Sequence, residues 1–278
     1  MGAYVEELLK TVNIEIREED EKYAERYASV LKTAVTAAFA LICVSVFLFM
    51  LKSGIKFTGL FLTLLVVVFV YLHIKNAKDR TERILYESCD PLKYLSRYTA
   101  LLKVSRRFGS TFDEHYYNIG SAFDYAGLDD EAFKLLDLFR NRCTDEKGAF
   151  MYELLAARIA FTDNNAEALK EHLSMATRLR NEFNTTQHQE KLYDNAMQLP
   201  IMLDIAEKKE YRKGLDAFAH TSKTKFNNKL DELISNYFLY ILGKGLNDDW
   251  LVEKHGNFVI ENGGTMRHKE QVLAERSN

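Results

Sequence analysis

Hydrophobic positions form two long runs in the first quarter of the chain. Residues Thr33 to Leu51 include no charged side chain over 19 positions, and the 18 residues from Phe57 to Ile74 are polar only at two threonines, one tyrosine and one histidine. A helix needs about 20 apolar residues to cross a bilayer core about 30 Å thick. A core helix of a soluble protein normally keeps a polar face. The pattern therefore predicts two membrane-spanning helices, with two buried core helices as the alternative.

The charges beside these runs predict an orientation. Only five residues, Lys52 to Lys56, separate the runs, so the two helices form a hairpin and both chain ends lie on one side. The acid-rich segment 1–32 precedes the first run, which argues against a cleaved signal peptide. Basic residues favour the cytoplasmic side of a membrane, and we expect both termini there. The loop contains two basic residues, whereas the outer flanks of the runs contain nine. The nine are Arg17, Lys22, Arg26, Lys32, Lys75, Lys78, Arg80, Arg83 and Lys93.

Small residues in the first run indicate close helix packing. Thr33 and Ala37, like Ala34 and Ala38, are spaced four apart and would let a second helix approach closely. That second helix is either the other arm of the hairpin or a helix of another protein or copy, so a homo-oligomer is possible. No ionisable residue lies in the middle of either run, which disfavours a transporter.

The composition and the breaks predict an all-α fold in four parts. Only 2 prolines and 13 glycines occur in 278 residues, which suits helices and not a β-sandwich. We expect a polar, amphipathic helical segment at 1–32, the transmembrane hairpin at 33–74, a stalk and linking helix at 75–108, and a helical-repeat domain at 109–278. Asp90 and Pro91 mark a helix start within the third part, as N-cap and first helical residue.

The stretch from Tyr116 to Phe139 resembles a tetratricopeptide repeat. Counted as position 4 of a 34-residue unit, Tyr116 is followed by small residues at positions 8 and 20, where two antiparallel helices would pack closely. The residues that carry the resemblance are Tyr116, Ile119, Gly120, Phe123, Gly127, Ala132 and Leu136.

Three later segments repeat the pattern more weakly. Their predicted turns are Asp163–Asn165, Lys208–Glu210 and Gly243–Asp249, and the spacing from Ala132 to Ala168 is 36 residues instead of 34. The order of hairpin, Asp-Pro helix start and degenerate repeats also resembles a group of uncharacterised bacterial membrane proteins with tetratricopeptide-like cytoplasmic domains. That resemblance implies a location at the membrane and an interaction role.

The resemblance to tetratricopeptide repeats implies a groove for a protein partner. In such families four positions of each first helix face a groove that takes a peptide or a helix. We therefore expect a membrane-anchored scaffold whose partner is basic or apolar. The implied groove residues are Glu114, Tyr117, Ser121 and Asp124 in the first unit, and Phe150 and Glu153 in the second.

The sequence carries no recognised catalytic, cofactor or metal motif. It lacks a glycine-rich phosphate loop, a nucleophile elbow and paired histidines, and the three cysteines show no zinc spacing. The net charge of −3 gives no reason to expect nucleic-acid binding. We thus expect no enzyme, no cofactor and no metal. The alternative is an enzyme, or the regulatory subunit of one, in a membrane-bound complex. A pocket that gathers titratable groups with perturbed pKa values would favour that alternative.

Overall fold

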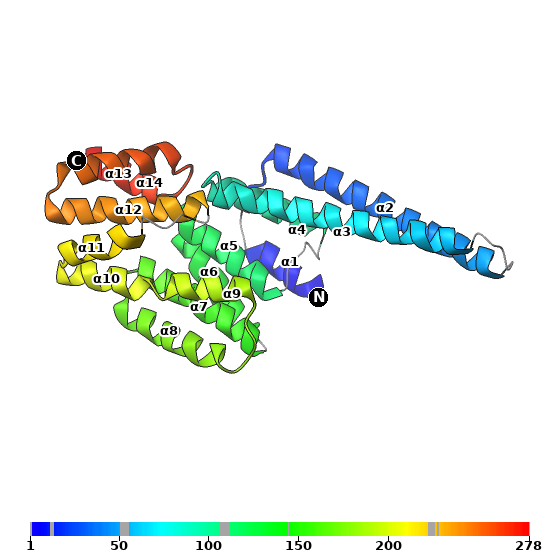
Figure 1. The fold of residues 1–278 in the computed structure, drawn as a ribbon, viewed down its shortest axis with the longest axis horizontal. Coiled ribbons are helices and arrows are strands. Elements are labelled where there is room, and N and C mark those ends of the chain that lie inside the picture. Colours follow the sequence, from blue (N-terminus) through cyan, green and yellow to red (C-terminus); the bar gives the residue numbers. More distant parts are fainter. Residues whose placement is uncertain are drawn as a thin grey trace. The chain divides into compact units, whose positions relative to one another are not determined.

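The computed structural model confirms the all-α prediction. It describes residues 2–11, 14–50, 56–105, 112–143, 145–221, 226 and 228–277, in which fourteen α-helices and no strand occur (Figure 1). Of the predicted connecting loop Lys52–Lys56, residues 52–55 lie outside the described residues, and Lys56 begins a helix. The chain divides into two compact units, residues 1–5, 14–83 and 96–109, and residues 6–13, 84–95 and 110–278.

The first unit contains the two apolar runs as long helices. Helix α2 covers Glu18–Met50 and α3 covers Lys56–Tyr86, and both are long and apolar enough to cross a membrane. Many of their large apolar side chains are exposed, with Phe39 68% and Phe61 60% exposed. A core helix of a soluble protein would bury such side chains, but only 6% of each apolar window is buried. The exposure therefore favours a membrane environment over a protein core.

The polar end of α2 is held by a buried carboxylate. Asp20 is fully buried and accepts hydrogen bonds from the Ser96 hydroxyl at 2.7 Å and from Arg97 Nε at 2.6 Å. Both partners belong to α4 (Pro91–Val104), and the backbone N–H of Arg17 donates to the same Ser96 hydroxyl at 2.9 Å. The guanidinium of Arg97 also lies over the ring of Tyr23. Because a buried charge needs such partners, this cluster fixes where α2 begins.

The start of α4 agrees with the predicted cap. The helix begins at Pro91, and Asp90 accepts a hydrogen bond from the backbone N–H of Lys93 at 3.0 Å. The hydroxyl of Thr265 donates to the same carboxylate oxygen at 2.7 Å. Asp90 thus caps one helix and ties it to the turn that precedes the last helix of the chain.

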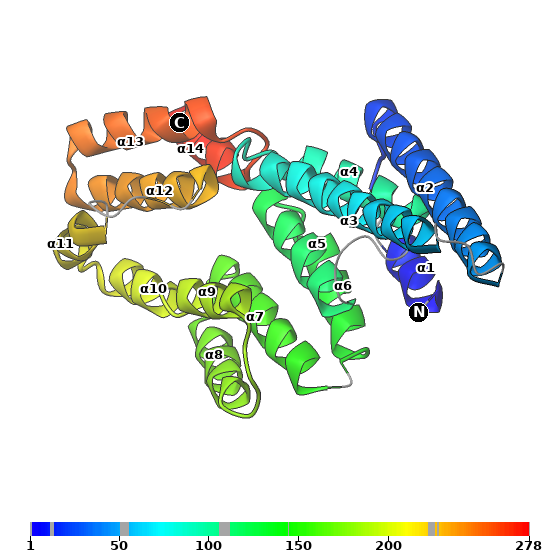
Figure 2. The ribbon, with the colours of Figure 1, turned by 45° about the vertical axis from the view of Figure 1, so that its right-hand side comes forward.

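The second unit is built mainly from helices that pack on the next helix along the chain (Figure 2). The predicted turn Asp163–Asn165 separates two helices as expected, and Lys208–Glu210 overlaps a helix end by one residue. The predicted turn Gly243–Asp249 is mostly helical, because only Asn247 and Asp248 separate the two helices there. Side chains of Asp145, Asn165 and Asp248 cap three of the helices. The pairs are α5 (Phe112–Ala126) with α6 (Asp129–Arg140), α7 (Glu146–Thr162) with α8 (Ala166–Arg180), α10 (Leu199–Lys208) with α11 (Tyr211–Thr221), and α12 (Lys229–Leu246) with α13 (Asp249–Asn262). Helix α9 (Gln187–Ala196) is inserted after the second pair, α14 (Arg267–Ser277) follows the last, and α1 covers Gly2–Thr11.

Gly120 allows α5 to approach its neighbours closely. A Cβ atom added there would lie 2.5 Å from Cδ2 of Leu155 on α7 and 3.2 Å from Cδ2 of Leu135 on α6. Both leucines are fully buried, so neither has free space into which it could move. The small residue expected from the repeat pattern therefore lies at a three-helix contact.

We predict that Gly120→Leu lowers the free energy of unfolding by about 1–3 kcal/mol or more, because the larger side chain overpacks this contact. Thermal unfolding of the full-length chain in detergent measures the effect. Lys170→Leu, at an exposed position of α8, is the matched control and should leave the midpoint nearly unchanged. Equal midpoints for the two variants would contradict the close contact.

Candidate functional site

A hollow of about 280 Å³ opens in the second unit. We call it the inner hollow and define it by Tyr117, Asp124, Arg158, Asn195, Ser235 and His268. Its walls come from the end of α3 and from α5, α7, α9, α10, α12 and α14, so helices far apart in the sequence contribute together. Many of its other lining residues are apolar, among them Leu154, Phe161 and Leu230. The hollow combines an apolar wall with a polar floor.

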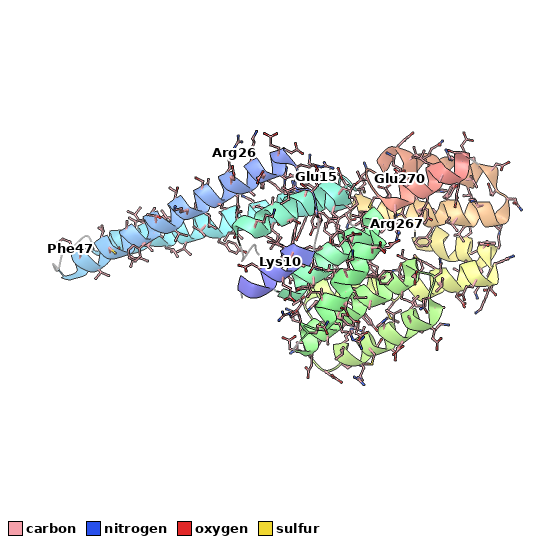
Figure 3. All side chains as sticks on the ribbon, turned by 180° about the vertical axis from the view of Figure 1, so that it is seen from behind. Lys10, Glu15, Arg26, Phe47, Arg267 and Glu270 are labelled. Carbon is pink, nitrogen blue, oxygen red and sulfur yellow. The ribbon has the colours of Figure 1, made fainter. Side chains whose placement is uncertain are left out.

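The floor is organised by one carboxylate. Asp124 is 4% exposed and accepts three hydrogen bonds, from Arg158 Nε at 2.7 Å, from the Thr162 hydroxyl at 2.7 Å and from Arg267 Nη1 at 3.3 Å. Arg267 also donates through Nη2 to both oxygens of Asp129, at 2.8 and 2.7 Å. Figure 3 marks Arg267 at the start of α14, beside α5. These contacts connect α5, α6, α7 and α14 through side chains alone.

Arg158 is held in its charged state. Its guanidinium lies 3.8 Å from the centre of the Tyr125 ring, a cation–π arrangement. Burial works against the charge, but the neighbouring Tyr125 and Asp124 outweigh it, so the pKa of Arg158 is raised. Burial likewise raises the pKa of Tyr125 to about 12, and raises the pKa of Tyr117. At neutral pH the arginine is therefore a cation and both phenols are neutral.

His268 is held in its neutral state. Burial, followed by the charges of Arg158 and Arg267, lowers its pKa to about 3. The side chain as a whole is partly exposed, but its Nδ1 atom is buried and has no hydrogen-bond partner among the described residues. The ring meets that of Tyr237 edge-on at 4.5 Å between centroids. The buried nitrogen, not the exposed edge, decides the cost of protonation.

The charges that line the inner hollow cancel. Asp124 and Asp231 face Arg158 and Arg267, while His268 is neutral. Burial raises the pKa of Asp231. The acidic face that the sequence suggests at Asp124 is thus neutralised by arginines from other helices, and the lining gives no electrostatic preference for a basic partner.

The six predicted groove residues separate into two groups. Tyr117, Ser121 and Asp124 line the inner hollow together. The other three do not line it. Phe150 is fully buried, with its ring against Phe183 at 5.5 Å.

The two glutamates of the second group lie elsewhere. Glu114 is in the first turn of α5 and is partly exposed. Glu153 pairs with His172 Nδ1 at 2.7 Å, which joins α7 to α8. The resemblance-based positions therefore find the floor of the hollow in the first helix pair, whereas in the second pair they fall on the core and on the helix–helix contact.

A second cavity adjoins the first. This side hollow measures about 230 Å³ and includes Met202, Tyr211, Tyr237 and Ile241. It shares with the inner hollow six residues: Phe161, Thr162, Met202, Phe238, Arg267 and His268. The rings of Phe161 and Phe238, which line both hollows, pack with their centroids 6.1 Å apart. Two neighbouring compartments with an apolar partition suit two side chains of one extended segment.

The inner hollow gathers several titratable groups with shifted pKa values, which is the feature expected of the enzyme alternative. The shifts, however, hold each phenol and His268 neutral and Arg158 charged near pH 7, far from the range in which a group exchanges protons in catalysis. Burial also raises the thiol pKa values of Cys89 and Cys143, to about 11 and about 12, which disfavours both as nucleophiles. In the described part of the chain, no three His, Cys, Asp or Glu side chains are placed to hold a metal ion. The arrangement is suited to binding.

Arg158, Thr162, Arg267 and His268 were not foreseen as site residues. One signal was present: Arg158 is a charged residue in the otherwise apolar segment Leu154–Phe161 and lies 34 residues after Asp124. No local signal indicates Arg267, because it reaches Asp124 from 143 residues away.

We predict that Asp124→Ala lowers the free energy of unfolding by about 3 kcal/mol, because it leaves the largely buried Arg158 without its carboxylate. Asp129→Ala is the matched control: it removes the other carboxylate bound by Arg267, but at a side chain 51% exposed, and should cost less than about 1 kcal/mol. Thermal unfolding of both full-length variants in detergent gives the comparison. Equal losses would show that Asp124 does not hold the site together.

The lowered pKa of His268 predicts that the folded chain loses stability in acid. Its pKa is about 3 in the folded chain and about 6.5 when unfolded, so below pH 6.5 the unfolded state binds the extra proton. Stability is complete above pH 6.5 and falls as the pH drops toward 3. His268→Gln should therefore show a smaller decrease in unfolding temperature between pH 7 and pH 5 than the unmodified chain. Because the pKa of His255 is also lowered, the unfolding temperature of both proteins still decreases somewhat in acid. Parallel curves would exclude the buried neutral state of His268.

Comparison with known proteins gives no match. No family model matches the chain, and neither a curated protein nor a solved structure matches it. The two hollows and the exposed apolar helices are therefore the observations on which a function is proposed.

Proposed function

We propose that this protein is a membrane-anchored scaffold whose helical domain binds an extended or helical segment of a partner protein in the inner and side hollows. The observation that carries the proposal is the pair of adjoining cavities with apolar walls and a charge-balanced floor. Such a lining favours a partner segment with two apolar or aromatic anchors over a strongly basic one, because the lining has no net charge to attract cations. No cofactor is needed for this role.

The anchor in this proposal is the helical hairpin. Two helices with bare apolar side chains, each long enough to span a bilayer, support insertion as two spans in the cell membrane. The excess of basic residues on the flanks favours both termini in the cytoplasm. The helical domain would then select partners near the inner face of the membrane.

The second candidate, an enzyme or the regulatory subunit of one, is favoured by the cluster of shifted pKa values. It requires a group that changes protonation near neutral pH, and the phenols, Arg158 and His268 do not supply one. A regulatory subunit remains compatible with the same hollows, since it also binds a partner segment. The identity of the captured partner distinguishes an adaptor from a regulatory subunit.

A photo-crosslinking amino acid at Gln198, an exposed residue that lines the inner hollow, tests the proposal. Full-length protein is crosslinked in intact cells and recovered from carbonate-washed membranes. We expect one discrete protein adduct, because the residue faces the segment-binding cavity. The same amino acid at Lys170, on the exposed side of α8, should give no such adduct.

Ser235→Trp adds specificity to this test, since the indole would fill the inner hollow while the Asp124 network stays intact. It should abolish the adduct at Gln198. Ser174→Trp, at an exposed position of α8, is the matched control and should not. Recovery of the chain in the soluble fraction would contradict the anchor, and an adduct that survives Ser235→Trp would contradict the groove.

A further inference from the structure

A polar cavity lies between α2 and α3 in the first unit. We call it the interfacial hollow and define it by Tyr23, Arg26, Tyr27, His73, Asn76 and Arg80; it measures about 340 Å³. Each of the two long helices contributes one arginine to it. Figure 3 marks Arg26 near the polar end of α2 and Phe47 near the opposite end of the same helix.

The two arginines have free guanidinium groups. Both side chains are exposed, and neither Arg26 nor Arg80 forms an ion pair with another described residue. By contrast, Lys22 and Lys78 on the same helices pair with Glu18 and Glu82. Two unpaired cations that converge on one cavity from separate helices form a ready site for an anion with several oxygen acceptors.

The cavity lies at the level expected for lipid headgroups. Arg26 precedes the first apolar run by seven residues and Arg80 follows the second by six, which places both about 10 Å along the helix from the apolar boundary. The headgroup layer is about 5–8 Å deep on each side of the hydrocarbon core, and a long arginine side chain spans the difference. Side chains lean toward the helix N-terminus, so Arg80 leans toward the apolar run of α3, whereas Arg26 must extend against this tilt to reach the same level.

Aromatic rings form the boundary with the apolar region. His73 stacks on Tyr27 at 5.0 Å and on Phe69 at 6.1 Å between centroids. Its Nε2 also lies 3.4 Å from the backbone oxygen of Tyr27. Rings with a polar edge are enriched where hydrocarbon meets headgroups. This stack therefore marks the interface on the structure itself.

An apolar groove continues from the interfacial hollow along the spans. It measures about 520 Å³ and is lined by Ala34 and Ala37 of α2 and by Leu65 and Phe69 of α3. Val30 lines both cavities, and Phe69 in the groove stacks on His73 in the hollow. The two cavities together thus have the form of a lipid, with a cationic end at headgroup level and an apolar trough beside it.

We propose that this composite site binds one anionic phospholipid, whose phosphate lies between Arg26 and Arg80 and whose acyl chain lies in the groove lined by Ala37 and Leu65. The proposal depends on the membrane anchor proposed above and not on the partner-binding hollows. A free phosphate would satisfy the arginines equally well, but it would leave the adjoining apolar groove empty. The shared residue Val30 therefore favours the lipid.

Native mass spectrometry of the full-length protein in detergent tests this site, with phosphatidylglycerol, phosphatidylcholine and inorganic phosphate as separate probes. The unmodified chain should prefer phosphatidylglycerol over phosphatidylcholine. Arg26→Gln with Arg80→Gln should reduce that preference roughly 25-fold, because each direct ion pair with the phosphate that is lost contributes a factor of about five. Both side chains are exposed, so the double variant should fold.

The control removes two other cations from the same helices. Lys32→Gln with Lys75→Gln changes the charge equally at exposed positions that line neither cavity, and should retain the preference. Ala37→Phe, which fills the apolar groove, should lower the occupancy of both lipids.

Three results would overturn the lipid site. They are an unchanged preference in the arginine double variant, an equal loss in the lysine control, and displacement of phosphatidylglycerol by inorganic phosphate. Failure of the chain to fractionate with membranes would instead overturn the anchor itself, so the two failures are distinguishable.

Discussion

The second unit depends on the burial of one carboxylate, Asp124. A carboxylate that is 4% exposed is stable only if it is surrounded by donors, and the chain supplies them from α7 and α14. The same requirement explains why α14, the last helix of the unit, meets α5 at this point. Because the donors occupy the floor of the inner hollow, the network that stabilises the unit also removes net charge from its candidate binding surface.

The first unit shows the opposite pattern, with apolar side chains exposed instead of a charged side chain buried. Its long helices expose rings such as Phe39 and Phe61, which would be costly in water and are suited to hydrocarbon. A buried polar cluster lies at the end of α2, where Asp20 binds Ser96 and Arg97. Between these two regions lies the stack of Tyr27 on His73, so the polarity changes over a short length of helix.

The candidate site was predicted in part because helical spacing is a local property. Tyr117, Ser121 and Asp124 are four and three residues apart and must share a face of α5. Phe150 is a different case, since it lies in the core against Phe183 and the repeat pattern does not distinguish a groove position from a core position in a degenerate unit. The charge of the hollow was beyond local reasoning, since Arg267 reaches Asp124 across 143 residues.

The sequence by itself determined the helical class, the two long apolar helices, the turn at Asp163–Asn165 and the cap at Asp90, because each follows from periodicity, length or a residue's effect on the adjacent backbone. Tertiary structure decided which side chains meet. It placed Arg158 and Arg267 on Asp124, made His268 neutral, and brought Arg26 and Arg80 to one cavity. Burial and charge pairing depend on distances between helices, and those distances are set by the packing of the whole chain.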